Sequence, residues 1–338
     1  MRRAHLTTAL LVAASLVLAG CGGGDDKSSG DETPESQQVA GSTEVDATWP
    51  MTGLPVTGDE EAAQTHPVLV TKMDNTYSSS PQIGLSEADL VVEELVEGGL
   101  TRLAAFFYSQ TPDNVGPVRS MRASDIGIVS PVNATVVTSG AAGQTIARIK
   151  GAGIQFFQEG AKGFSRDTSR PAPYNLFADL TTVADEAKDG EARPADYLPW
   201  GSAKDLPQGQ PASKIAASFS GGHTTSWTYG KDGYTNANTY AASGDEFPAD
   251  TVLVLRVRLG DAGYRDPAGN PVPETKFTGS GQAMLFHAGR LVRGTWKKKS
   301  LSSALSLSTK AGELPVPAGH TWIELVPTTQ GGNVTFTK

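Results

Sequence analysis

Two arginines stand on either side of a serine in a loop that leads towards a predicted helix. They are Arg119 and Arg122, with Ser120 between them, and the helix is expected from about residue 122 to 129. Guanidinium groups bind phosphate and carboxylate oxygens through paired hydrogen bonds, and a helix N-terminus adds free N–H donors. The arrangement predicts an anion-binding loop. The alternative is a pair of structural Arg–Asp bridges.

A second loop repeats the pattern in a stiffer form. Arg166 and Arg170 flank Asp167, two prolines follow, and Asn175 closes the loop. If these arginines converge with Arg102, Arg119 and Arg122, the ligand is anionic, carrying a phosphate or a carboxylate. If each arginine bridges an acid instead, the loop braces the fold.

Polar residues also follow the first predicted strand, which covers residues 66–73. Asp74 and Asn75 come directly after Lys72 and Met73. Ligands bind at strand ends in α/β sheets, so both side chains are candidates for a binding cleft. The competing interpretation is an Asx-turn, in which the side chain caps its own backbone.

Acidic residues interrupt an apolar strand further along. In a strand Glu94 shares one face with Val92, and an acid on an apolar face must be paired or neutral. Arg102 is the nearest cation across the predicted hairpin, so a structural Glu–Arg pair is expected, with acid/base chemistry as the alternative. The candidate ligand-binding residues are Asp74, Asn75, Glu94, Arg102, Arg119, Arg122, Arg166, Asp167, Arg170 and Asn175.

Familiar catalytic and cofactor motifs do not occur. The sequence contains no GxSxG elbow, HExxH motif, Walker loop or dinucleotide fingerprint. Beyond residue 20 the histidines are scattered without ligand spacing, so no metal and no cofactor is predicted. The three later tryptophans are expected in the core, with a sugar-stacking surface as the alternative; they are Trp227, Trp296 and Trp322.

The N-terminus predicts the compartment. Arg2 and Arg3 precede an apolar stretch, Leu6–Leu18, which is shorter than the ~20 residues a membrane-spanning helix needs. It ends in Leu-Ala-Gly-Cys, which resembles a bacterial lipobox with the chain's single cysteine, Cys21, at the lipidation position. A plain secretory signal with a chance cysteine is the alternative. We expect residues 1–20 to be a signal peptide and Cys21 to anchor the protein at the outer face of the cytoplasmic membrane.

Acidic residues are concentrated after this anchor. The chain has a net charge of −8, and removing residues 1–20 leaves −10, of which −6 lies in residues 22–48. This Gly-, Ser- and acid-rich stretch, with Cys21, is predicted to be a disordered tether, 21–48. An acidic chain is a poor candidate for nucleic-acid binding, which depends on Lys and Arg neutralising phosphates.

The remaining chain predicts two domains. Residues 49–195 alternate strands with short helices, which favours an α/β or α+β domain with a mixed sheet. It includes a hairpin near 90–96 and 101–108. A Pro- and Gly-rich linker is expected at 196–215, followed by a mainly β domain at 216–338 with a weak helix near 301–306. The run Lys297–Lys299 is expected to be a solvated strand end.

Several segments of the chain carry a family pattern. They are Met73–Asn75, Pro81–Leu85, Ala88–Glu94, Glu97–Arg102, Val115–Arg122, Arg166–Leu176, Gly279–Trp296 and Gly319–Ile323. Together they resemble the YerB-like lipoprotein family. The similarity covers nearly all of residues 50–338 and implies a two-domain extracytoplasmic lipoprotein, mixed α/β and then mainly β, without assigned catalytic residues. A looser similarity, of Thr101-Arg102 and Pro117–Ser120, is to the LytR-CpsA-Psr transferases, which use arginines on the pyrophosphate of a lipid-linked glycan.

Three functions remain open from the sequence. The first is a non-enzymatic lipoprotein that binds a cell-wall glycan or an envelope protein through the Asp-, Asn- and Arg-lined cleft. The second is an enzyme acting on a phosphate-bearing or polyprenyl-linked glycan, with Glu94 or Asp74 as base or metal ligand and the arginines stabilising charge. The third is a structural scaffold whose arginines all bridge acids.

Overall fold

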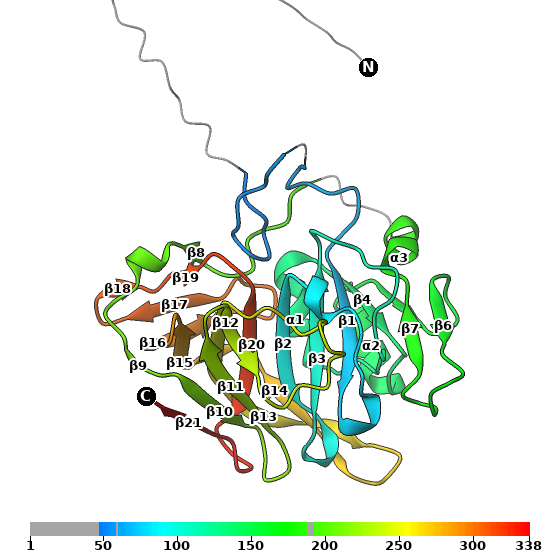
Figure 1. Ribbon diagram of the computed structural model, residues 1–338. Helices are drawn as coiled ribbons and strands as arrows, with labels where there is room; N and C mark the ends of the chain where they lie inside the picture. The colour runs from blue at the N-terminus through cyan, green and yellow to red at the C-terminus, as the bar shows by residue number, and fades with distance from the viewer. Residues whose placement is uncertain (1–46, 59, 188–191) are drawn as a thin grey trace, which may run out of the picture. The chain divides into compact units, whose positions relative to one another are not determined.

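One large mixed sheet organises the protein (Figure 1). The computed structural model describes residues 47–58, 60–187 and 192–338. Val45–Lys338 form one compact unit. The predicted signal peptide and Cys21 lie outside the described residues. In spatial order the sheet contains β18 (Gly312–Glu313), β17 (Ser306–Thr309), β16 (Arg290–Lys298), β15 (Gly279–His287), β13 (Thr251–Arg265), β20 (Thr321–Pro327), β2 (Leu90–Leu95), β3 (Thr101–Phe107), β1 (Leu69–Asn75), β4 (Thr135–Thr138) and β5 (Phe156–Gln158), with β14 (Pro271–Lys276) beside β13 and β9 (Gln210–Pro211) beside β16.

Smaller elements cover this sheet. Three short α-helices are described, and a separate four-stranded sheet is built from residues 214–236 and 333–337. Short 3-10 turns lie at Tyr77–Ser79, Leu85–Glu87, Glu97–Gly99, Ser130–Val132 and Ala203–Asp205. The elements outside the large sheet are α1 (Asp125–Val129), α2 (Gly143–Gly151), α3 (Leu180–Glu186), β6 (Phe164–Arg166), β7 (Leu176–Ala178), β8 (Trp200–Gly201), β19 (Val316–Pro317), β10 (Lys214–Ser218), β11 (Thr224–Gly230), β12 (Gly233–Asn236) and β21 (Asn333–Thr337).

The fold class predicted from the sequence is confirmed. The first half is a mixed sheet with short helices, and the second half is mainly β. The predicted hairpin is β2 and β3, joined by a turn in which Gly98 has φ 72° and Gly99 φ 75°, a conformation that favours glycine. All residues of β1, β2 and β3 are buried, as expected for strands covered on both faces.

The central strand of the sheet comes from the end of the chain. β20 pairs in parallel with β2 on one side and with β13 on the other. Residues from both predicted domains therefore share one hydrogen-bonded sheet. The stretch predicted to link the two domains, 196–215, contributes β8 and β9 and buries Tyr197 and Leu198.

Strand alternation separates two hydrophobic cores. On one face α1 and α2 pack over Val70, Val92 and Phe106. On the other face α3 and the four-stranded sheet pack over Leu69, Val91 and other residues of the same strands. The predicted core positions of Trp227, Trp296 and Trp322 are confirmed, since none is more than 2% exposed.

Near the end of β16 the predicted helix is wrong, and the expected solvated strand end holds for Lys297 and Lys299, which are exposed, but not for Lys298. No helix forms at 301–306, where a turn leads into β17. Lys298 is 1% exposed, and its ammonium group donates hydrogen bonds to the carbonyl oxygens of Ser300 (3.1 Å), Leu301 and Ser303 (2.6 Å). The alternation of β16 turns Lys298 inward, where it holds these carbonyls in a turn.

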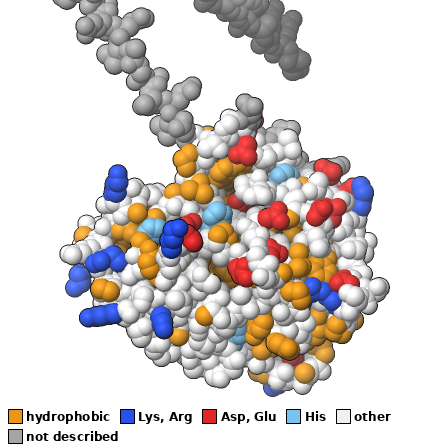
Figure 2. All heavy atoms as spheres, viewed as in Figure 1, with side chains coloured by type: hydrophobic (Ala, Val, Ile, Leu, Met, Phe, Trp, Pro, Cys, Tyr) orange, Lys and Arg blue, Asp and Glu red, His pale blue; other side chains and the backbone are white. Residues whose placement is uncertain are grey.

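Charge is distributed unevenly over the surface. Figure 2 shows acidic side chains gathered mostly right of centre on the face in view, and most Lys and Arg side chains towards the left. Burial and the neighbouring carboxylates of Asp245 and Asp113 raise the pKa of Glu87.

Among the described residues, no helix has the length and apolar composition to cross a bilayer.

The shared sheet predicts that the body unfolds as one unit. Ile323 of β20 is fully buried between the two halves, so Ile323→Ala should lower the free energy of unfolding by about 2–5 kcal/mol. In urea, tryptophan fluorescence and far-UV circular dichroism of residues 45–338 should give coincident transitions for both proteins.

Leu301→Ala is the control, because Leu301 is 40% exposed and its loss should cost less than about 0.5 kcal/mol. Separate transitions for residues 49–195 and 216–338 would contradict this expectation.

Candidate functional site

Three of the predicted arginines meet beside the C-terminal end of β1 and the N-terminal end of β3. Arg102 is the second residue of β3 and lies directly opposite Asp74, the last but one residue of β1. Arg119 Nε donates to Asp74 Oδ2 at 2.9 Å, and Arg122 Nε donates to Glu97 Oε2 at 2.9 Å. We call these five residues the arginine cluster.

Backbone pairing sets the position of the loop that carries two of them. The loop runs beside β1, where Met73 bridges to Val118 and the Arg119 amide donates to the Lys72 carbonyl at 2.7 Å. On its other side the Val118 amide donates to Leu176, at the start of β7. The loop is thereby held between two strands, which places the Arg119 side chain over Asp74.

Arg102 differs from the other two arginines because no acid among the described residues lies within hydrogen-bond distance of its side chain. It is 5% exposed, its Nη1 donates to the Ser120 carbonyl at 2.9 Å, and its Nε is buried without a partner. Burial and the positive charge of Arg122 lower the pKa of Arg102 to about 10, against the attraction of Glu97 and Asp74. The cluster therefore holds three guanidinium groups against two carboxylates.

The second arginine loop pairs mostly within itself and with its neighbours. Arg166 Nε donates to Glu159 at 2.6 Å and Arg166 also bonds Asn175, while Arg170 lies 3.2 Å from Asp167. Arg170 also donates to the Pro81 carbonyl at 2.8 Å. These two arginines have local acidic partners, unlike Arg102.

A tyrosine connects the two loops. The guanidinium carbon of Arg119 lies over the ring of Tyr174, 5.2 Å from the ring centroid. The second loop therefore forms one side of the arginine cluster. Such cation–π contacts orient an arginine without neutralising it.

Asp74 and Asn75 do not share a cleft. Successive side chains of a strand point to opposite faces, and Asn75 faces away from Asp74. Its amide donates to Glu93 Oε1 at 3.0 Å and to Thr101 at 2.9 Å. The expected cleft lined by both residues is therefore divided by the sheet itself.

Glu94 pairs with a lysine instead of the expected Arg102. Lys72 Nζ donates to Glu94 Oε1 at 3.1 Å and to Asp125 Oδ1 at 2.6 Å, and the side chains of all three are fully buried. Burial raises the pKa of Glu94, against the attraction of Lys72. Although Glu94 lies opposite Arg102 in the hairpin, the guanidinium group reaches Ser120, so no Glu–Arg pair forms.

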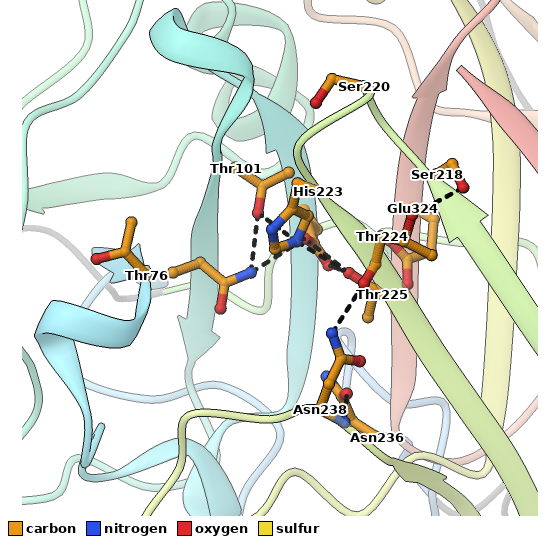
Figure 3. A network of polar contacts seen from close by, with 12 residues as sticks. Thr76, Thr101, Ser218, Ser220, His223, Thr224, Thr225, Asn236, Asn238 and Glu324 are labelled. Atoms are coloured by element: carbon orange, nitrogen blue, oxygen red, sulfur yellow. Dashed lines mark hydrogen bonds and ion pairs between the residues drawn. The ribbon is translucent and has the colours of Figure 1, made fainter. Parts of the chain in front are cut away.

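A polar network that the sequence did not predict lies on the opposite face (Figure 3). His223, in the turn before β11, contacts Glu93 Oε1 at 2.9 Å and Thr101 at 3.0 Å through Nε2. Thr225 donates to the same carboxylate at 2.9 Å. The network connects the four-stranded sheet to the β2–β3 hairpin.

The network contains a second acid, Glu324, directly beside Glu93 in the pairing of β2 with β20. Trp227 Nε1 donates to Glu324 at 2.7 Å and Trp322 Nε1 to Glu93 at 3.2 Å. Burial and the negative charge of Glu93 raise the pKa of Glu324 well above its ordinary value. Burial opposes the ionisation of Glu93, but His223 outweighs it and the pKa of Glu93 is lowered. Glu324 is the carboxyl that retains a proton.

Comparison with known proteins identifies the family. Residues 51–193 match the model described as "Protein of unknown function (DUF3048) N-terminal domain", and residues 215–323 match its C-terminal domain. The chain belongs to the DUF3048 family. The resemblance to YerB-like lipoproteins seen in the sequence is thus confirmed.

Relatives of this DUF3048 protein agree with its fold. It is 24% identical over 290 residues to "Putative lipoprotein YerB" of Bacillus subtilis (strain 168), covering 82% of this chain and 86% of that protein. The crystal structure of the YerB protein from Bacillus subtilis superposes with a TM-score of 0.71 at 20% identity, covering 86% of this chain and 99% of the other. The structural likeness concerns the fold alone.

The Lys72 ion cluster predicts a large stability effect. Lys72→Met leaves Glu94 and Asp125 buried without their cation, so the free energy of unfolding should fall by about 3–5 kcal/mol in urea. Lys162→Met is the matched control, because Lys162 pairs with Glu186 at the surface, where solvent screens the pair, and its loss should leave the stability nearly unchanged. Similar losses in both variants would show that the buried cluster is not a stability determinant.

His223 predicts a pH-dependent contribution to stability. Burial opposes protonation, but Glu93 outweighs it and raises the pKa of His223 above 6.5. The contribution of protonated His223 to the stability of the fold is fully present below pH 6.5 and is lost as the pH rises through the raised pKa of His223. Since the pKa of Glu93 is lowered from 4.5, its own share is lost as the pH falls through that lower value. The melting-temperature difference between wild type and His223→Gln should be largest between these limits.

His287→Gln is the control for this pH profile. Burial lowers the pKa of His287, so its protonation opposes folding and its loss should give no maximum at acidic pH. Equal profiles for the two variants would contradict the role of the Glu93–His223 pair.

Proposed function

We propose that the protein is an extracytoplasmic lipoprotein, held at the outer face of the cytoplasmic membrane by a lipid on Cys21. Its body binds a phosphate- or carboxylate-bearing component of the cell envelope at the arginine cluster. Support for the anchor comes from the lipobox-like sequence that ends in Cys21 and from a family relative named as a lipoprotein.

The observation that carries the binding proposal is the buried, incompletely paired charge of Arg102. Its Nε has no hydrogen-bond partner, and a buried charge is costly unless it is paired. An anion placed beside Arg102 would supply the missing acceptor and balance the third guanidinium group of the cluster. Arg119, 21% exposed, offers such an anion a route from solvent.

A purely bracing role accounts for the other arginines better than for Arg102. Arg119, Arg122, Arg166 and Arg170 each lie within salt-bridge distance of an acid. A brace needs both partners, and Arg102 has only a backbone carbonyl.

Binding is also favoured over catalysis by the state of the nearby acids. Asp74 accepts hydrogen bonds from Arg119 and Thr76, and Glu97 accepts from Arg122. Burial opposes the ionisation of Glu97, but Arg122 outweighs it and lowers the pKa of Glu97, which makes it a weak proton acceptor. A general base would have to be free to accept a proton from the substrate.

Two variants of the body, residues 45–338, separate ligand binding from bracing. A native-state ligand at about 100 times its dissociation constant should add about 2.7 kcal/mol to the free energy of unfolding. With pyrophosphate or a muropeptide as additive, Arg102→Met should abolish this gain and leave the basal melting temperature unchanged or higher. Arg119→Met should lower the basal stability by about 1–3 kcal/mol, because Asp74 loses its charged partner.

The additives distinguish the chemistry of the ligand. Stabilisation by pyrophosphate alone would indicate a phosphate-bearing component, and stabilisation by the muropeptide alone a carboxylate. No response to either additive, together with a clearly lower melting temperature of Arg102→Met, would make Arg102 a brace and reject the proposal. Turnover of either additive would favour an enzyme.

A further inference from the structure

A cationic hollow lies away from the arginine cluster. It has a volume of about 340 Å³ and lies between β13, β15 and the turn that leads into β21. Its charged residues are Arg256 and Arg258 of β13. The volume is at the small end of the range for ligand sites, which suits one small ligand unit.

The two arginines have the same orientation and no acidic partner. They are two residues apart in one strand, so their side chains leave the same face. Arg256 Nη2 donates to the Gly332 carbonyl at 2.9 Å, and neither arginine forms a salt bridge within the described residues. No Asp or Glu lines the hollow. Burial lowers the pKa of Arg256 without an offsetting acid.

The far wall of the hollow is held in place by a close backbone approach. A Cβ atom at Gly332 would lie 2.0 Å from the Pro327 carbonyl oxygen, so only glycine fits this turn. The close turn presents the Gly332 carbonyl to Arg256 and sets Asn333 at the rim. The site is thus shaped by the fold before any ligand arrives.

Uncharged polar side chains complete the lining. Ser280, Gln282 and Asn333 line the hollow, and in the described part of the chain their side chains form no hydrogen bond with protein. Hydroxyl and amide groups are donors and acceptors at once, which matches the hydroxyl groups of a sugar. Met284 and Val334 add apolar surface for the sugar's C–H groups.

The hollow and the arginine cluster lie on opposite faces of the sheet. Arg256 alternates with Leu255 and Val257 of the core under α1 and α2, and so points to the other face. Arg102 shares its face with Ala104 and Phe106 of that same core. One small ligand therefore cannot occupy both sites.

We propose that the hollow between β13, β15 and β21 binds an anionic saccharide unit, with Arg256 and Arg258 on its phosphate or carboxylate group and Gln282 and Asn333 on its hydroxyl groups. The site is independent of the arginine cluster, and a polymer carrying repeated anionic sugars could reach both faces of the body.

Calorimetric titration of the body, residues 45–338, carrying Arg102→Met to remove the anion contact proposed for the arginine cluster, tests the hollow with four probes: glucose 6-phosphate, glucuronate, glucose and inorganic phosphate. We expect binding of at least one of the two anionic sugars, weakening as NaCl is raised. Arg256→Met and Arg258→Met should each weaken it by at least about tenfold. Gln282→Ala should weaken the binding of the anionic sugar more than the binding of inorganic phosphate.

Arg265→Met is the matched control. Arg265 lies in the same strand and also donates to a single backbone carbonyl, that of Gly269, but it does not line the hollow. In the same Arg102→Met background, Arg265→Met should keep full affinity for the anionic sugar. This result would separate the hollow from general charge effects, and the background removes the arginine cluster from the comparison.

Three outcomes would overturn the proposal. The first is that neither anionic sugar binds. The second is binding that survives the combined loss of Arg256 and Arg258. The third is inorganic phosphate binding as tightly as glucose 6-phosphate, with Gln282→Ala without effect, which would remove the sugar from the site. Comparison of glucose 6-phosphate with glucuronate identifies which anionic group the site prefers.

Discussion

The insertion of β20 between β2 and β13 is the constraint on which the rest of the structure depends. A parallel strand in this position needs partners on both sides, and those partners come from opposite ends of the body. The pairing also brings Glu93 and Glu324 side by side in a buried layer. Two adjacent buried carboxyl groups cannot both ionise cheaply, so the layer needs His223 and the surrounding hydrogen bonds to hold one charge and one proton.

Strand alternation then decides which polar residues can cooperate. Asp74 and Arg102 leave one face of the sheet, whereas Asn75 and Glu93 leave the other. Residues adjacent in sequence thus belong to separate networks, each satisfied by different covering elements. An account of function has to treat the two faces separately, which is why the arginine cluster contains Asp74 but not Asn75.

Local sequence patterns were sufficient to predict secondary-structure elements but not to predict which side chains pair with one another. The β2–β3 hairpin was predictable, because two glycines separate two apolar runs. The partner of Glu94 could not be predicted in this way. The nearest cation in sequence, Arg102, donates to the Ser120 carbonyl, and Lys72 of β1 pairs with Glu94 instead. An acid inside an apolar strand indicates a buried polar network, and Glu324, between apolar residues of its strand, has this pattern. His223 lies in a Gly-Gly-His turn, and no feature of the sequence around it indicates a buried partner.

Two other buried cations, Lys72 and Lys298, can be compared with Arg102 in the acceptors that surround them. Lys72 is neutralised by two carboxylates. Lys298 has no acid but donates to three carbonyl oxygens, and even so its pKa falls to about 8 because of burial. Arg102 has one carbonyl, a buried Nε without an acceptor and two other guanidinium groups nearby. Among the described residues, the fold supplies acceptors to the first two cations from within, and the shortfall at Arg102 is the observation on which the proposed binding of an external anion rests.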